Sequence, residues 1–170
     1  GSGIITTAGK AGTAPEESIQ AAVDSMATLN KGAADAMIEV GVNAATDVTG
    51  FGLLGHLSQM MKASGTSAAL NWSKIPLLPG VLELANAGSV SGGTARNMEA
   101  LEGFVNREDG ISDIEFTILA DAQTSGGMLI SVPEERSDVI VKSLVANQTL
   151  YSAVIGKVFE GDPGIITVWQ

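Results

Sequence analysis

The order of structural elements is clearest in residues 42–65, which read VNAATDVTGFGLLGHLSQMMKASG. The apolar start, residues 42–46, predicts a short strand, and a small polar turn over residues 47–52 follows it. Apolar residues then recur at helical spacing, at Leu53, Leu54, Leu57, Met60 and Met61. Gly65 stands where a glycine commonly ends a helix. A strand, a glycine-rich turn and a helix therefore follow one another directly.

Similar patterns extend to both sides of this stretch. Upstream, the β-branched residues 4–7 predict a short strand, and residues 13–16 match a capping box. A helical pattern follows, which Gly32 is expected to kink and Gly41 to end. Downstream, strands are predicted over residues 68–72, 116–120, 128–132, 151–159 and 165–169. Short helices are predicted up to residue 87, over residues 94–101 with a cap at Thr94, and from residue 133. Helices mixed with adjacent strand pairs predict an α+β domain, with a mixed or antiparallel sheet covered by helices.

Composition excludes several classes of protein. The chain has 170 residues, of which 45% are hydrophobic, so one domain over residues 1–170 with a sizeable core is expected. With no Cys, the sequence has no disulfide, thiolate zinc site or Cys nucleophile. A net charge of −10 argues against nucleic acid and anionic membrane surfaces as partners. No apolar run approaches the roughly 20 residues of a membrane span, and no signal peptide opens the chain. We therefore expect a cytoplasmic protein.

Charged residues make up only 16% of the chain, where about a quarter is usual, and glycine is frequent with 21 residues. Small and uncharged side chains suit a large buried interface. They also suit glycine-rich ligand loops. Composition alone leaves both interpretations open.

Two stretches resemble phosphate-binding loops but fail in detail. Residues 3–10 are similar to a Walker A loop, but one residue too many separates the glycines and Ala11 stands where a magnesium-binding hydroxyl is needed. Residues 50–55 match G-x-G-x-x-G. A dinucleotide site also needs an acid about 20 residues further on, and no Asp or Glu occurs between Asp47 and Glu83. The sequence therefore disfavours both kinds of site.

Asp47 stands at the end of a predicted strand, just before the expected start of a helix. A carboxylate there can bind Mg²⁺, which prefers oxygen ligands. The backbone N–H groups around Thr49 and Gly50 could receive a phosphate, because the N-terminus of a helix attracts anions. The alternative is that Asp47 only caps the helix.

Two further polar loops and one His allow similar alternatives. Residues 121–127 (DAQTSGG) form either a satisfied turn or a ligand or interface loop between two strands. Residues 91–97 (SGGTARN) form either a plain helix cap or an anion nest with Arg96 as a positive clamp. His56 is the only His, and a structural role is expected for it.

At these loops the sequence resembles the selenophosphate synthetase (selenide, water dikinase) family. Residues 46–56 (TDVTGFGLLGH) are similar to one signature of that family, and residues 121–127 to a second, which often has Pro where Ala122 stands. Residues 91–97 resemble a third typical stretch. Residues 3–8 (GIITTA) are similar to the point where the family's second domain begins. The resemblance covers nearly the whole chain, but only the C-terminal half of the family's members.

The resemblance implies the C-terminal domain of a synthetase that makes selenophosphate, AMP and phosphate from ATP, selenide and water, with Mg²⁺ bridging the phosphates. An N-terminal domain, absent here, would form the dimer and carry most of the ATP site and the catalytic Cys or selenocysteine. No catalytic residue is then expected in this chain, which should be inactive alone. The resemblance makes Asp47 a metal ligand across the domain interface. The residues expected to face the same cleft are Thr49, Gly50, Thr124, Ser125, Gly126 and Gly127.

The family also belongs to a wider group that includes aminoimidazole ribonucleotide synthetase. The implied fold is the α+β C-terminal domain of that group, partly like the ferredoxin arrangement. Two alternatives remain for function. One is the C-terminal domain of another ATP-dependent synthetase of the wider group. The other is an interaction domain whose glycine-rich loops contact a partner.

Overall fold

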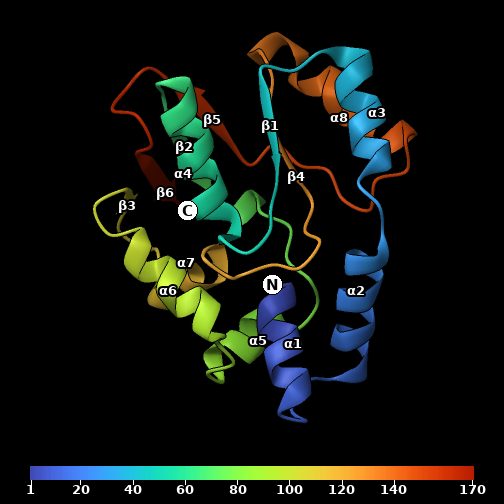
Figure 1. Cartoon of the computed structure of the whole chain (residues 1–170), viewed down its shortest axis with the longest axis vertical. Coiled ribbons are helices and arrows are strands. Elements are labelled where there is room, and N and C mark those ends of the chain that lie inside the picture. The colour runs from blue at the N-terminus through green and yellow to red at the C-terminus, as the bar shows by residue number, and fades with distance from the viewer.

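The computed structural model describes all 170 residues and mixes helices with short strands (Figure 1). The helices are α1 (Ser2–Lys10), α2 (Glu16–Ala27), α3 (Lys31–Val40), α4 (Gly52–Ser64), α5 (Val81–Asn86), α6 (Gly92–Ala100), α7 (Asp113–Leu119) and α8 (Ser137–Ala146). Two 3₁₀ turns are η1 (Trp72–Lys74) and η2 (Glu134–Arg136). The strands are β1 (Ala44–Asp47), β2 (Ser67–Asn71), β3 (Val105–Arg107), β4 (Met128–Ser131), β5 (Gly156–Phe159) and β6 (Ile166–Trp169). The α+β class predicted from the sequence is confirmed.

The strands form two sheets. β1 and β4 make an antiparallel pair, in which Asp47 lies opposite Met128. The other sheet has the order β3-β6-β2-β5, where β6 runs parallel to both β3 and β2, and β5 is antiparallel to β2. The two last strands therefore do not pair with each other, although a turn separates them in the sequence.

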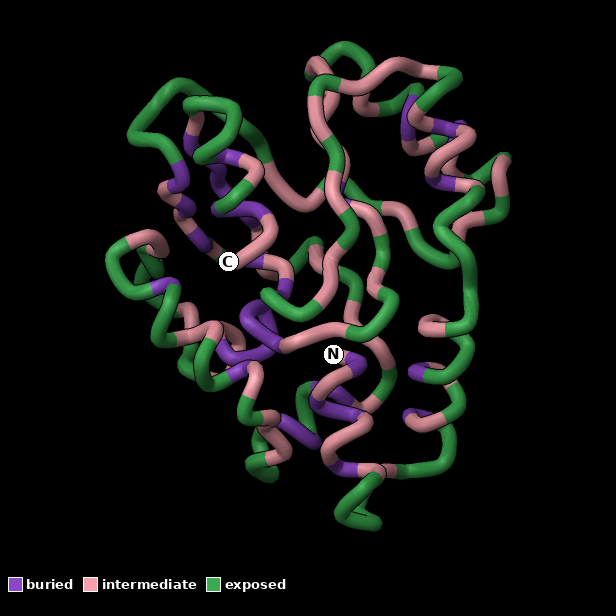
Figure 2. The backbone as a smooth tube through the Cα atoms, in the orientation of Figure 1, coloured by how far each residue is buried: buried purple, intermediate pink, exposed green.

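Two hydrophobic clusters hold the elements together, and Figure 2 shows their buried segments in purple. The larger cluster joins α4 to the four-stranded sheet, and its members are Leu54, Leu57, Met61, Ala68, Leu70, Leu101, Leu119, Ala120, Leu129, Ile166 and Val168. The smaller cluster joins α1, α2, α5 and α7, through Ile4, Ile5, Ala8, Ala22, Val81, Leu84, Ala85 and Ile118. Because α7 contributes to both clusters, it ties the helical part of the chain to the sheet. None of the helices has the length and apolar character that a membrane span requires.

The strand predicted over residues 4–7 is wrong, because these residues lie in α1. Ile4 and Ile5 are fully buried against α2 and α5, and this burial outweighs the β-preference of branched side chains. The hydroxyls of Thr6 and Thr7 donate hydrogen bonds to the Gly3 carbonyl oxygen, at 3.1 and 2.7 Å. Tertiary packing therefore overrides a local preference here.

The strand predicted over residues 116–120 is also wrong, because the chain forms α7 there. Ser112 and Glu115 make a capping box: the Ser112 hydroxyl accepts the N–H of Glu115, and the Glu115 carboxylate accepts the N–H of Ser112 at 2.7 Å. Two of the helix's unpaired N–H groups are satisfied in this way. The S-x-x-E spacing was visible in the sequence, and it outweighs the apolar run that suggested a strand.

Ser112→Ala is expected to lower the free energy of unfolding by about 1 kcal/mol, the usual effect of removing an N-cap hydroxyl. For a chain of this size the midpoint temperature should fall by about 2–4 °C in a thermal melt followed by circular dichroism. Ser64→Ala is the control, because Ser64 is an exposed helical Ser. Equal melting of the two variants would contradict a stabilising cap.

Several other boundaries differ from the sequence predictions. Thr13 does not cap α2, which begins after Pro15 without a side-chain cap; the Thr13 hydroxyl bonds instead to Ala8. Gly32 does not kink a continuous helix, since α2 ends at Ala27 and α3 starts at Lys31. A Cβ at Gly32 would overlap the Asn147 carbonyl oxygen, so glycine allows α3 to approach the end of α8. Only β5, at the end of the strand predicted over 151–159, is a strand, and the helix predicted from residue 133 begins as η2.

Candidate functional site

The antiparallel pairing of β1 with β4 brings two of the predicted loops together. The N–H of Val48 donates to the Gly127 carbonyl oxygen at 2.9 Å, and the N–H of Gln123 donates to the Thr49 carbonyl oxygen at 3.0 Å. The 47–50 loop, which begins at the last residue of β1, therefore lies directly beside the 121–127 loop. In Figure 1 the lower ends of β1 and β4 lead into these loops, just above the N-terminus of the chain.

Gly126 permits this close contact. A Cβ on Gly126 would overlap the Val48 carbonyl oxygen, which belongs to the backbone and cannot rotate away. Any larger residue must push the two loops apart. Next to it, Ser125 has a φ of +47°, in the left-handed region that non-glycine residues rarely adopt. The 121–127 loop joins α7 to β4, not two strands as predicted.

The third stretch, residues 91–97, contacts both loops through α6. Thr94 does not cap this helix as predicted; Ser91 does, and its hydroxyl accepts the N–H of Thr94 at 3.1 Å. One turn further on, the Asn97 side-chain amide donates to the carbonyl oxygens of Gly50 at 2.9 Å and Ala120 at 3.0 Å. The three glycine-containing stretches singled out in the sequence thus meet at one place.

The residues predicted to bind a nucleotide or metal lie on the outer side of this junction. Most are exposed and two are half-buried: the exposed ones are Asp47, Gly50, Thr124, Ser125 and Gly127, and the half-buried ones are Thr49 and Gly126. Added Cβ atoms at Gly50 and Gly127 would meet nothing within 4 Å, and neither residue has a positive φ. No contact within the chain requires glycine at these two positions. Both glycines are exposed, and no side chain of their own covers their backbone atoms.

Asp47 is the last residue of β1, and its carboxylate is exposed. None of the chain's salt bridges includes it. It does not cap α4 either, because that helix begins after Phe51 without a side-chain cap. The capping alternative left open by the sequence is therefore wrong.

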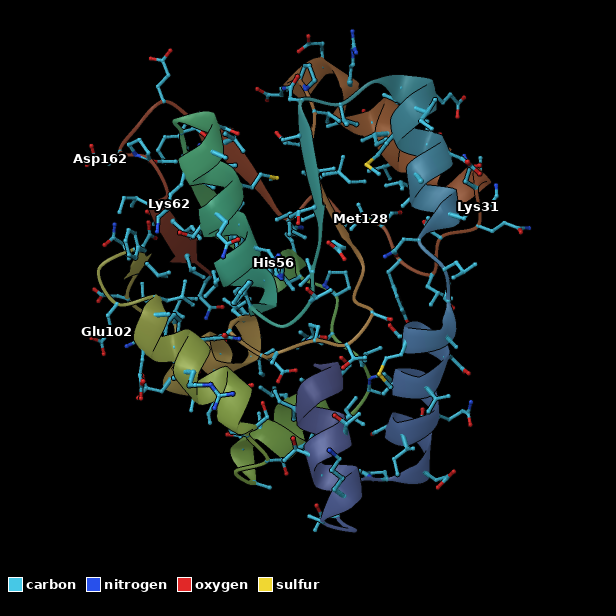
Figure 3. The ribbon with its side chains drawn as sticks, in the orientation of Figure 1. Lys31, His56, Lys62, Glu102, Met128 and Asp162 are labelled. Atoms are coloured by element: carbon cyan, nitrogen blue, oxygen red, sulfur yellow. The ribbon has the colours of Figure 1, made fainter.

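His56, on the first turns of α4, holds the 47–50 loop in place. Its Nε2 accepts the N–H of Thr49 at 3.0 Å and lies 3.1 Å from the Thr49 hydroxyl oxygen. Figure 3 shows His56 at the N-terminal end of α4, on the side of the helix that faces β1. Burial lowers the pKa of His56 below its usual 6.5, and the negative charge of Asp47 offsets part of this effect. The imidazole is therefore favoured in its neutral form, which the hydrogen bond from Thr49 requires.

The pKa of His56 is expected to lie below 6.5 in the folded chain. A pH titration of the imidazole NMR signals measures it directly, because the chain contains one His. Asp47→Asn should lower this pKa further, since the charge it removes favours the imidazolium. The lowered pKa contributes stability above about pH 6.5, and this stability is lost as the pH falls from 6.5 through the folded-state pKa. A folded-state pKa at or above 6.5 would contradict this account.

Asp121 and Gln123 point inward rather than toward the outer side of the loop. The Asp121 side chain is 0% exposed, and its Oδ2 accepts the N–H of Gly3 and of Ile4, at 3.0 and 3.2 Å. This role of Asp121 was not predicted from the sequence. One signal could have revealed it: Asp121 is the only charged residue between Glu115 and Glu134, in an otherwise apolar and small-residue stretch. A lone acid in such surroundings is a candidate for burial, and a buried carboxylate needs hydrogen-bond partners.

The residues at this junction can supply one of the oxygen ligands that a magnesium ion needs. The chain contains no group of three or more His, Cys, Asp or Glu side chains that could hold a metal ion. Asp47 nevertheless offers one exposed carboxylate of the kind Mg²⁺ binds, usually together with waters and substrate phosphates. Complete coordination would need oxygen ligands from outside this chain.

Comparison with known proteins places these features in a family. The sequence pattern described as "AIR synthase related protein, C-terminal domain" matches residues 7–168. The chain is 43% identical over 163 residues to a "Selenide, water dikinase" of Caldanaerobacter subterraneus, covering 94% of this chain and 46% of the relative. It is 43% identical over 170 residues to a protein of the same name from Myxococcus xanthus, covering 99% and 48%. A Yersinia pseudotuberculosis relative of that name is 40% identical over 163 residues, covering 95% and 45%. The chain thus spans about half the length of these relatives.

Proposed function

The chain belongs to the AIR synthase related protein, C-terminal domain family, and from this we propose that it is one half of a selenide, water dikinase. Such an enzyme converts ATP, selenide and water into selenophosphate, AMP and phosphate. The identities of 40–43% to relatives with that name support the assignment. The other half would carry the catalytic groups, most of the ATP site and the homodimer contact. This chain, a single domain over residues 1–170, would then be inactive alone.

The observation that carries this proposal is the meeting of three glycine-containing stretches at one exposed junction. Thr49, Gly50 and the segment Thr124, Ser125, Gly126 and Gly127 would face the phosphates of ATP. Backbone N–H groups and hydroxyls are donors that phosphate oxygens accept. The bare backbone at Gly50 and Gly127 lets a ligand or the other half of the enzyme approach closely.

Asp47 would supply one carboxylate oxygen to Mg²⁺ at this junction. When bound, Mg²⁺ neutralises the charge that develops on phosphate oxygens during transfer. The chain's own part is to hold that carboxylate at a fixed place. β1 positions Asp47 opposite Met128, and His56 fixes the adjacent loop through the N–H of Thr49.

A fusion of this chain to the missing half of the Myxococcus xanthus relative tests the proposal. The purified chain, with ATP, selenide and Mg²⁺, should form no selenophosphate detectable by phosphorus NMR. The fusion should form selenophosphate together with AMP and phosphate. The control is the fusion without selenide, which should form no selenophosphate.

Three results would overturn the assignment. Turnover by the chain alone would contradict its role as an incomplete half. A folded fusion that consumes ATP to the same extent with and without selenide would favour another ATP-dependent synthetase of the wider group. Binding of a protein partner that persists when the three loops are altered would favour an interaction domain instead.

A further inference from the structure

The buried carboxylate of Asp121 lies at the N-terminus of α1. Besides the N–H groups of Gly3 and Ile4, its Oδ2 accepts the Gln123 side-chain amide at 2.7 Å. The first N–H groups of a helix have no partner within the helix, and the helix dipole favours a negative charge there. A residue more than 100 positions away in the sequence therefore satisfies the start of α1.

The carbonyl oxygen of the Gln123 side chain also binds the start of α1. Its Oε1 accepts the N–H of Ser2 at 3.1 Å and the Ser2 hydroxyl at 2.9 Å. The inner side of the 121–127 loop is thus fixed to α1 by two side chains. α1 is itself anchored by Ile4, Ile5 and Ala8 in the smaller hydrophobic cluster.

Thr94, on α6, joins this network from the other side and is also 0% exposed. Its hydroxyl donates to Oδ1 of Asp121 at 3.0 Å and accepts the N–H of Ala122 at 3.2 Å. A buried carboxylate destabilises a protein unless its oxygens are hydrogen-bonded. Here both oxygens have partners, and no buried side-chain nitrogen or oxygen in the chain lacks one.

Asn97 lies three residues after Thr94, so both side chains project from the same face of α6. Thr94 bonds to the 121–127 loop, while Asn97 bonds to the carbonyl oxygens of Gly50 and Ala120. One face of one helix therefore holds both loops of the candidate site. We call Thr94, Asn97 and Asp121 the brace.

We propose that the brace consists of positioning residues, which set the spacing between the 47–50 loop and the 121–127 loop. Thr94 and Asp121 are 0% exposed, so these two side chains act through the backbone of the loops rather than by direct contact with a ligand. The nucleotide role of those loops rests on the proposed function. The spacing itself is a property of this chain, and it can be tested without a nucleotide.

Amide hydrogen exchange of the 170-residue chain, measured by NMR, tests the brace. Thr94→Val keeps the side-chain shape but removes the hydroxyl that bonds to Asp121. Exchange at the N–H groups of Gly3, Ile4, Gln123 and Val48 should become about tenfold faster, because losing a hydrogen bond to a charged group changes an equilibrium at least this much. The N–H groups of Ala68 and Asn71 in β2 should exchange as before.

Thr117→Val is the matched control. Thr117 is also buried, and its hydroxyl bonds to the Asp113 carbonyl oxygen at 2.7 Å, within α7. The Thr117→Val variant should leave exchange at the N–H groups of Gly3, Gln123 and Val48 unchanged. Thr94→Ser, which keeps a hydroxyl at this position, should restore the wild-type exchange pattern. If Thr94→Val made all N–H groups of the chain exchange faster, or only the N–H of Ala122, the proposed role of the brace would be contradicted.

Kinetics of the fusion enzyme separate the brace from the proposed function. Thr94→Val should lower kcat/KM for ATP about tenfold, mainly through KM, and Thr94→Ser should restore it. Faster exchange in the loops with unchanged kinetics would support the brace but contradict the nucleotide role of the loops. Unchanged exchange would overturn the brace itself, whatever the kinetics.

Discussion

Asp47→Asn in the fusion enzyme is expected to lower kcat/KM for ATP by at least about 100-fold, the effect of losing one electrostatic contact to the transition state. Asn keeps the shape of Asp but loses the charge that, in the proposed function, attracts Mg²⁺. Because the carboxylate is exposed and in none of the chain's salt bridges, the free energy of unfolding should change by no more than about 0.5 kcal/mol. Initial rates over a range of Mg²⁺ concentrations, with thermal melts of the same samples, measure both quantities.

Asp138→Asn is the matched control, because Asp138 is an exposed acid in the first turn of α8. It should leave both the rate and the Mg²⁺ dependence unchanged. An Asp47→Asn enzyme with the wild-type rate and the wild-type Mg²⁺ requirement would contradict the proposed role of Asp47 as a metal ligand.

Gly126→Ala is expected to lower the free energy of unfolding by about 2–3 kcal/mol, in the range of overpacked sites. The added methyl group would overlap the Val48 carbonyl oxygen, so the backbone of one loop must move. For a chain of this length the midpoint temperature should fall by about 4–12 °C. Thermal unfolding followed by circular dichroism measures this fall directly in the 170-residue chain.

Gly127→Ala is its neighbour and control, with the opposite expectation. An added Cβ there meets nothing within 4 Å, so stability should stay within about 0.5 kcal/mol of wild type. In the fusion enzyme the same methyl group should weaken ATP binding about tenfold, if bare backbone at this position contacts the ligand. Equal losses of stability in the two variants would contradict the geometry. Full ATP affinity in Gly127→Ala would contradict the ligand contact.

The sequence identified the loops of the candidate site but not how they are joined. Strand β1, helix α4 and the glycine that ends α4 were predictable because their signals are local: an apolar run, a helical period and Gly65 with a φ of +67°. Asp47 and the 121–127 loop stood out through residue type. The hydrogen bonds between Asp121, Thr94 and α1 join positions far apart in the chain, and no local pattern encodes them.

The two strands that were predicted wrongly also reflect contacts and caps that apolar or β-branched runs alone do not reveal. Residues 4–7 have branched side chains that favour a strand, yet burial between helices makes them helical. The apolar residues of α7 were assigned to a strand because period alone does not separate a short buried helix from a strand. The capping box at Ser112 and Glu115 would have resolved that ambiguity.

The order of the larger sheet has a consequence for how the chain folds during synthesis. β6 lies between β3 and β2, and both its neighbours are parallel to it, while Ile166 and Val168 are 0% exposed. β2 ends at residue 71, but its neighbours β5 and β6 begin only at residues 156 and 166, so β2 leaves the ribosome well before either of them, at roughly 5–20 residues per second. Until then its apolar residues and both of its hydrogen-bonding edges lack their partners in the sheet. The exposed β2 is thus the segment through which the nascent chain would most readily associate with other chains or with chaperones. This exposure ends only when residues 166–169 insert as β6 between β3 and β2.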